Sequence, residues 1–105
     1  MTTTTYNTPV VGSSSTWGKI QSVKPIAEGI DWITTASHGG FVVSPARLEQ
    51  MPENLRKCSF TQDNNFEEDC SWCAVVIAFP NHFPVNILQN ARECYEACYR
   101  AKHGW

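Results

Sequence analysis

The side chains of this sequence that could do chemistry are one histidine and three consecutive acids. His38 stands in the run Ser37-His38-Gly39-Gly40, between two segments rich in β-branched and aromatic residues, and the acids are Glu67, Glu68 and Asp69. An imidazole titrates near neutral pH, and carboxylates serve as acid–base groups or as ligands for hard metal ions. If the fold brings these residues together, they would form a small hydrolytic or metal-dependent site.

The same residues also have simpler uses. A histidine in a turn can hydrogen-bond to nearby backbone, and acids in the first turn of a helix complement the helix dipole. A third use is recognition without catalysis, in which polar side chains of the turn and the acidic run form one binding surface. The residues of that expected surface are Thr35, Ser37, His38, Glu67, Glu68 and Asp69.

The five cysteines all lie in the second half of the chain, at irregular spacing. An odd number without regular spacing does not indicate a disulfide framework, so we expect free thiols in a reducing compartment. The alternative is a zinc site built from Cys70-x-x-Cys73 and Cys94-x-x-x-Cys98. Both pairs fall within expected helices, which disfavours that site, because structural zinc ligands usually sit on turns.

A cysteine nucleophile is a further alternative. Cys70 would supply the thiolate, His38 the base, and Asp31 or Glu68 the group that orients the histidine. The acids directly before Cys70 oppose a second negative charge there, which disfavours this arrangement.

Composition narrows the classes of function. The 105 residues correspond to one domain, and a hydrophobic content of 42% with four tryptophans is enough for a small core. A net charge of −2 gives no field that would attract nucleic acid or an anionic membrane. No apolar stretch approaches the roughly 20 residues that span a bilayer, and the first residues lack the features of a secretory signal. We therefore expect a cytoplasmic protein without a cofactor.

The first half of the chain predicts a flexible arm followed by strands. Residues 1–16 are rich in Thr and Ser, residues 18–24 form an irregular edge strand ended by Pro25, and residues 30–35 and 41–43 form an antiparallel hairpin. The adjacent glycines are expected to make its turn.

The second half predicts helices. Ser44-Pro45 is typical of a helix start, for a helix to about Met51 with one more turn over residues 53–57, before a polar loop over residues 59–65. Asn65 and Glu68 resemble a capping box for a helix over residues 66–79, although residues 72–79 are apolar on every side and also fit a buried strand. After a connector over residues 80–84, an amphipathic helix begins at Val85 and reaches about residue 101.

Together these elements predict a single α+β domain over residues 17–105. Its antiparallel sheet has about three strands, from residues 17 to 44, and is covered by two longer helices from residues 66 to 101. The expected core or near-core residues are Trp17, Ile20, Ile30, Trp32, Phe41, Val43, Leu48, Leu55, Trp72, Val75, Val76, Phe79, Leu88, Ala91 and Tyr95.

The chain also resembles a family of small uncharacterised proteins of bacteriophages, plasmids and bacteria. The matching blocks are Trp17-Gly18 with Gln21, residues 26–30, residues 34–41 with Ser44 and Arg47, Met51-Pro52, and residues 66–70 with Trp72. The resemblance covers about residues 17–80 and implies an accessory protein of a phage or mobile element, acting in the cytoplasm of a bacterial host.

Size, the resemblance and the acidic run favour one function over the others. We expect a non-enzymatic module that binds a host bacterial protein and inhibits or redirects it, for example as an inhibitor of CRISPR or restriction. Acidic side chains can occupy a surface that normally receives nucleic-acid phosphates. The alternative is a small hydrolase or metal-dependent enzyme centred on His38 and the three acids.

Overall fold

The computed structural model describes residues 8–59 and 64–105, and its centre is an antiparallel sheet. The sheet contains four strands in the order β3 (Ser22–Ala27), β4 (Ile30–Thr34), β5 (Gly39–Val43) and β6 (Asn65–Glu67). A separate ribbon pairs β1 (Ser14–Ser15) with β2 (Gly18–Lys19). The α+β class is therefore confirmed, and the sheet is larger than the three strands predicted.

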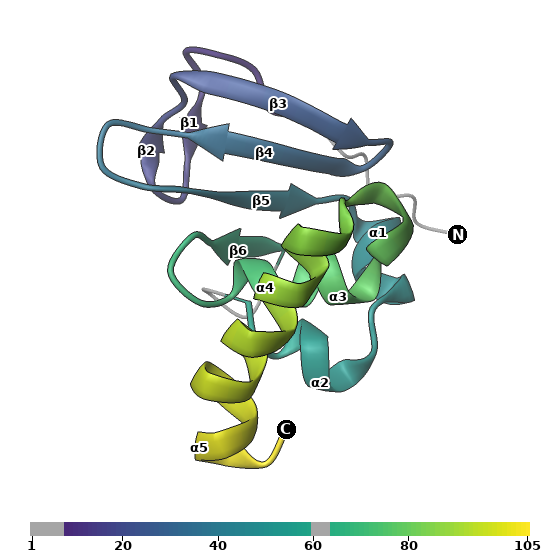
Figure 1. Ribbon diagram of the computed structural model, residues 1–105. Coiled ribbons are helices and arrows are strands. Elements are labelled where there is room, and N and C mark those ends of the chain that lie inside the picture. Colours follow the sequence, from purple (N-terminus) through teal and green to yellow (C-terminus); the bar gives the residue numbers. More distant parts are fainter. Residues whose placement is uncertain (1–7, 60–63) are drawn as a thin grey trace.

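The helices lie together beside the lower part of the sheet in Figure 1, with α4 crossing in front of α3. They are α1 (Pro45–Gln50), α2 (Glu53–Arg56), α3 (Trp72–Ala78), the 3-10 turn η1 (Pro80–His82), α4 (Val85–Tyr95), the π-helical segment η2 (Glu96–Arg100) and α5 (Ala101–His103). In the part of the chain that the structure describes, no helix has both the length and the apolar character needed to cross a membrane.

The central hairpin forms as predicted, but its turn is made differently. Trp32 pairs with Phe41 and Thr34 with Gly39, so both glycines belong to β5. Thr35 closes the loop instead: its amide donates to the carbonyl of His38 at 2.7 Å, and its hydroxyl accepts from the amide of His38 at 3.1 Å. The prediction that the adjacent glycines make the turn is therefore wrong.

Gly40 is instead needed for close packing on the face of the sheet opposite α3. A Cβ atom on Gly40 would lie 2.5 Å from the carbonyl oxygen of Phe66 and 2.6 Å from the ring of Trp17. The indole ring thus occupies the space that a side chain of β5 would fill. This contact attaches the segment between β1 and β2 to the sheet.

The helix predicted over residues 66–79 begins later. Residues 65–67 form β6, in which Phe66 is fully buried and pairs with Phe41, and only residues 72–78 are helical. Burial of a phenylalanine against the neighbouring strand outweighs the local preference of an acidic run for a helix start. The prediction that residues 72–79 form a helix rather than a strand is confirmed for residues 72–78.

Other local signals are confirmed with small changes. The Ser44 hydroxyl accepts from the amide of Arg47 at 3.2 Å, and Pro45 opens α1. The strand predicted over residues 18–24 is divided, because Gly18–Lys19 form β2 in the separate ribbon and β3 begins at Ser22. Pro25 lies within β3 rather than at its end, with a register shift beside it, and β3 is an edge strand as expected. The C-terminal helix forms, although Val85 at its start is 81% exposed.

Of the flexible arm expected over residues 1–16, the structure describes residues 8–16. Residues 1–7 and residues 60–63 of the expected polar loop lie outside the described residues. Pairing begins at Gly12, because the Gly12 amide donates to the carbonyl of Ile20 at 2.8 Å, the Ser13 carbonyl accepts from the amide of Ile20 at 2.9 Å, and β1 follows directly. Regular hydrogen bonding therefore begins before Trp17.

The core lies between the sheet and the helices. All the predicted core residues are buried or half-buried, with Ile30, Val43, Val75, Val76 and Ala91 fully so. The prediction missed several fully or nearly buried residues, namely Ile33, Met51, Cys58, Phe66, Cys73 and Ala74.

We predict that Gly40→Ala lowers the free energy of unfolding by about 2 kcal/mol or more, because the added methyl group collides with backbone as well as with an indole ring. Urea unfolding followed by tryptophan fluorescence measures the change. Ser37→Ala in the exposed loop is the control and should stay within about 0.5 kcal/mol of the natural protein. An equal, small effect of both substitutions would contradict this packing.

Candidate functional site

The tip of the hairpin presents two of the predicted site residues to solvent. Ser37 and His38 are exposed, whereas Thr35 is 8% exposed and uses its hydroxyl to close the loop. Thr35 thus has a structural role, and the side chains of Ser37 and His38 remain accessible on the loop.

The acidic segment lies directly beside this tip. The amide of Glu68 donates to the carbonyl of Gly39 at 2.9 Å, which continues the pairing of β6 with β5 by one residue. The Glu68 carboxylate lies over Gly39, with Oε2 3.2 Å from where a Cβ of that glycine would be. Glu68 and Asp69 are exposed, so their carboxylates reach solvent beside the exposed loop residues Ser37 and His38, and these four residues are here called the polar surface.

Glu67 does not belong to that surface, because its carboxylate holds the turn that leads into α3. Oε2 accepts from the amide of Asp69 at 2.7 Å, and Oε1 accepts from the amides of Cys70 and Ser71 at 2.8 and 3.2 Å. In return, the Ser71 hydroxyl accepts from the amide of Glu67 at 2.6 Å. The capping box predicted for Asn65 and Glu68 is therefore wrong. A reciprocal cap between Glu67 and Ser71 takes its place.

His38 and the three acids, the residues of the alternative enzymatic site, do not form a group with metal-ligand spacing among the described residues. In residues 8–59 and 64–105, the one group of at least three potential metal ligands within 4.8 Å of one another consists of cysteines. Asp31, considered as a partner for His38, is buried in β4 and pairs with Val42, at the other end of the hairpin from the turn. Catalytic use of His38 would therefore have to rely on Glu68 or Asp69 without Glu67.

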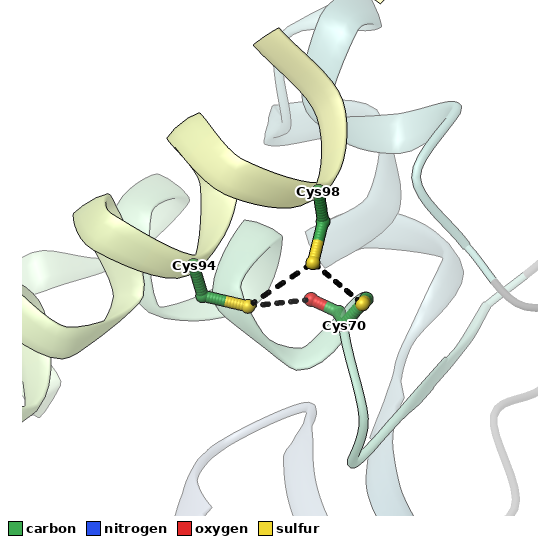
Figure 2. A group of neighbouring side chains, drawn as sticks. All are labelled: Cys70, Cys94 and Cys98. Atoms are coloured by element: carbon green, nitrogen blue, oxygen red, sulfur yellow. Dashed lines mark hydrogen bonds between the residues drawn. The ribbon is translucent and has the colours of Figure 1, made fainter. Parts of the chain in front are cut away.

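The cysteines form the second cluster, shown in Figure 2. The Sγ atoms of Cys70 and Cys98 are 2.6 Å apart, and those of Cys94 and Cys98 are 3.9 Å apart. Cys94 also points toward the carbonyl oxygen of Cys70 at 3.6 Å. Cys70 is in the turn after β6, Cys94 in α4 and Cys98 in η2, so segments far apart in sequence meet here.

The sequence grouped the cysteines differently. Cys70, Cys94 and Cys98 come together, whereas Cys73 is fully buried in the hydrophobic core. Cys58, at the end of α2, is also buried and donates to the carbonyl of Asn54 at 3.3 Å. The spacing of Cys94 and Cys98 indicated one shared helix face, but nothing local pointed to Cys70 as their partner.

Burial and hydrogen bonding disfavour the thiolate form of four cysteines, Cys58, Cys70, Cys73 and Cys94. The hydrogen bond with Cys98 and burial raise the pKa of Cys70 to about 12, and burial raises the pKa of Cys58 to about 12. Burial also raises the pKa of Cys73 and Cys94. A reactive nucleophile needs a lowered pKa, so the environment of Cys70 opposes the nucleophile hypothesis.

The tryptophans do not form an exposed binding surface. All four are half-buried, and Trp105 stacks on Tyr99 with 5.6 Å between ring centroids. The large hydrophobic residues that are clearly exposed among the described residues are Val10, Val11 and Val85.

We predict that Glu67→Ala lowers the free energy of unfolding by about 1–2 kcal/mol, because several backbone amides of the turn lose their acceptor. Glu67→Gln should have a smaller effect, since the amide oxygen still accepts. Glu68→Ala, at an exposed neighbour, is the matched control, and thermal unfolding compares the three. An effect at Glu67 no larger than at Glu68 would exclude the capping role.

Of three comparisons with known proteins, the one with family models found a match. A search among curated proteins and another among solved structures found no match. The family model described as a domain of unknown function, DUF7007, matches residues 10–104, which include the hairpin, the acidic turn and every cysteine. The sequence resemblance to an uncharacterised family is thus confirmed, and the chain belongs to the DUF7007 family.

Proposed function

We propose that this protein is a non-enzymatic binding module, encoded by a phage or mobile element, that acts in the cytoplasm of a bacterial host. It binds a host protein and inhibits or redirects it, with inhibition of a CRISPR or restriction system as the leading instance. The observation that carries this proposal is the polar surface formed by Ser37, His38, Glu68 and Asp69, held by backbone pairing between Glu68 and Gly39.

Rigidity is the first property that suits this surface to recognition. The loop is closed by Thr35, and the acidic turn is closed by Glu67 and Ser71, so the exposed side chains project from fixed backbone. A surface that is already ordered loses little conformational entropy when it binds, which favours affinity.

Charge is the second property. Glu68 and Asp69 are adjacent, exposed and acidic, which complements a partner surface rich in Lys and Arg. Proteins that bind nucleic acid have such surfaces, and enzymes of bacterial defence belong to that class. Occupation of the phosphate-binding surface would block access of the nucleic acid.

The enzymatic alternative has weaker support. Glu67 is engaged by backbone amides, and burial together with the Cys98 hydrogen bond disfavours a thiolate at Cys70. A binding surface requires none of these groups to be reactive. His38 then serves as a contact residue of the surface.

A charge-reversal experiment tests the binding role. The natural chain is immobilised, and proteins of a bacterial lysate that bind it in stoichiometric amount are identified and purified. We predict that Glu68→Lys combined with Asp69→Lys weakens that purified complex at least about tenfold, because opposite charges across an interface become like charges. Glu49→Lys combined with Glu93→Lys, at exposed acids of α1 and α4, is the control for net charge.

The control variant should bind like the natural chain and should act like it when phage infection and defence are measured in cells. If no stoichiometric partner is captured and expression leaves infection and defence unchanged, the proposal is rejected. Equal weakening by both variants would also reject this surface as the interface.

A further inference from the structure

The sulfur atoms of Cys70, Cys94 and Cys98 meet at a place where packing alone does not require cysteine. Cys58 and Cys73 are 4% and 0% exposed and serve as small apolar residues of the core. The other three are half-buried, and their thiols point toward one another, although Cys94 also packs against the edge of the core. Contacts between neutral thiols are weak hydrogen bonds, so they explain little of this convergence.

We propose that Cys70, Cys94 and Cys98 bind a thiophilic divalent cation of the Zn²⁺ class. Their ligand atoms lie within 4.8 Å of one another, and half-burial leaves them within reach of an ion from solution. Soft thiolate ligands select zinc and similar ions over Mg²⁺ or Ca²⁺. This site goes beyond the proposed binding function and does not depend on it.

The spacing of the sulfurs suits such an ion with a small adjustment. Zn–S bonds of about 2.3 Å place tetrahedral ligands about 3.8 Å apart. The separation of Cys94 and Cys98 is 3.9 Å, and that of Cys70 and Cys98 is 2.6 Å, so the Cys70 side chain has to move away from Cys98 when the ion enters. Cys70 lies in a turn outside α3, where a side-chain rotation displaces no helix.

The surroundings provide further support. Cys94 and Cys98 are four residues apart on continuous helical backbone, which presents both sulfurs on one face. The Glu67 carboxylate accepts from the amide of Cys70 at 2.8 Å, which fixes the backbone of this ligand.

The ion would connect two parts of the fold. It would link the turn after β6 to the end of α4, in addition to the packing of α4 on α3. Structural zinc contributes directly to folding free energy in this way. We therefore expect the ion to stabilise the C-terminal helix against the sheet.

The test uses the full chain, reduced and freed of metal, and titrates it with Co²⁺ as a spectroscopic probe before displacement by Zn²⁺. We expect about one ion per chain, with sulfur-to-cobalt charge transfer in the near ultraviolet and the intense visible bands of tetrahedral cobalt. Cys94→Ser and Cys98→Ser should each weaken binding at least about tenfold. Cys58→Ser, at a buried cysteine outside the three, should bind like the natural chain.

Circular dichroism of the metal-free variants separates loss of binding from loss of folding. If one serine variant does not fold, the cobalt spectrum of the natural chain still shows whether cysteines bind the ion, because the charge-transfer intensity reports thiolate ligands. Less than about one tenth of an ion per reduced chain would overturn the proposal. A stable Cys70–Cys98 disulfide in protein isolated from a reducing cytoplasm, or equal loss of binding in Cys58→Ser, would overturn it as well.

Discussion

The cap between Glu67 and Ser71 is the constraint on which both candidate sites depend. β6 ends at Glu67 and α3 begins at Trp72, so the chain changes direction within a few residues whose amides would otherwise lack partners. The Glu67 carboxylate accepts from three of these amides. Charged acceptors make the stronger hydrogen bonds, which allows one side chain to hold the whole turn.

Residues on the two sides of this turn have different surroundings. Glu68 and Asp69 project outward beside the hairpin tip, whereas Cys70 points toward Cys98 and the C-terminal helix. A rigid polar surface and a sulfur cluster are therefore adjacent in the chain and are positioned by the same cap. Binding of a protein and binding of an ion at these two places would each leave the other possible, since they use different side chains.

The sequence correctly predicted the elements that are stabilised by residues close to one another in the chain. The hydroxyl of Ser44 before a proline, and the β-branched residues around the hairpin, led to correct predictions of α1, β4 and β5. β6 was missed because its stability comes from Phe66 pairing with Phe41, which are far apart in sequence. The packing role of Gly40 depends on Trp17, which is distant in the sequence. Cys70, the partner of Cys94 and Cys98, lies in a turn, so the helical spacing of cysteines did not indicate it. The structure places Ser37, His38, Glu68 and Asp69 near one another, but the role of Glu67 as a cap could be seen only once the end of β6 was known.

Amide hydrogen exchange of the natural chain, followed by NMR, tests the central role of the cap most directly. Residues 68–71 form a turn rather than a regular helix, and amides of ordinary exposed turns exchange at nearly the rate of an unfolded chain. The account predicts that the amides of Asp69, Cys70 and Ser71 exchange at least about a hundredfold more slowly than that rate, because they are held by the Glu67 carboxylate. Exchange of these amides at the unfolded-chain rate, while the amides of β4 and α3 stay protected, would contradict it.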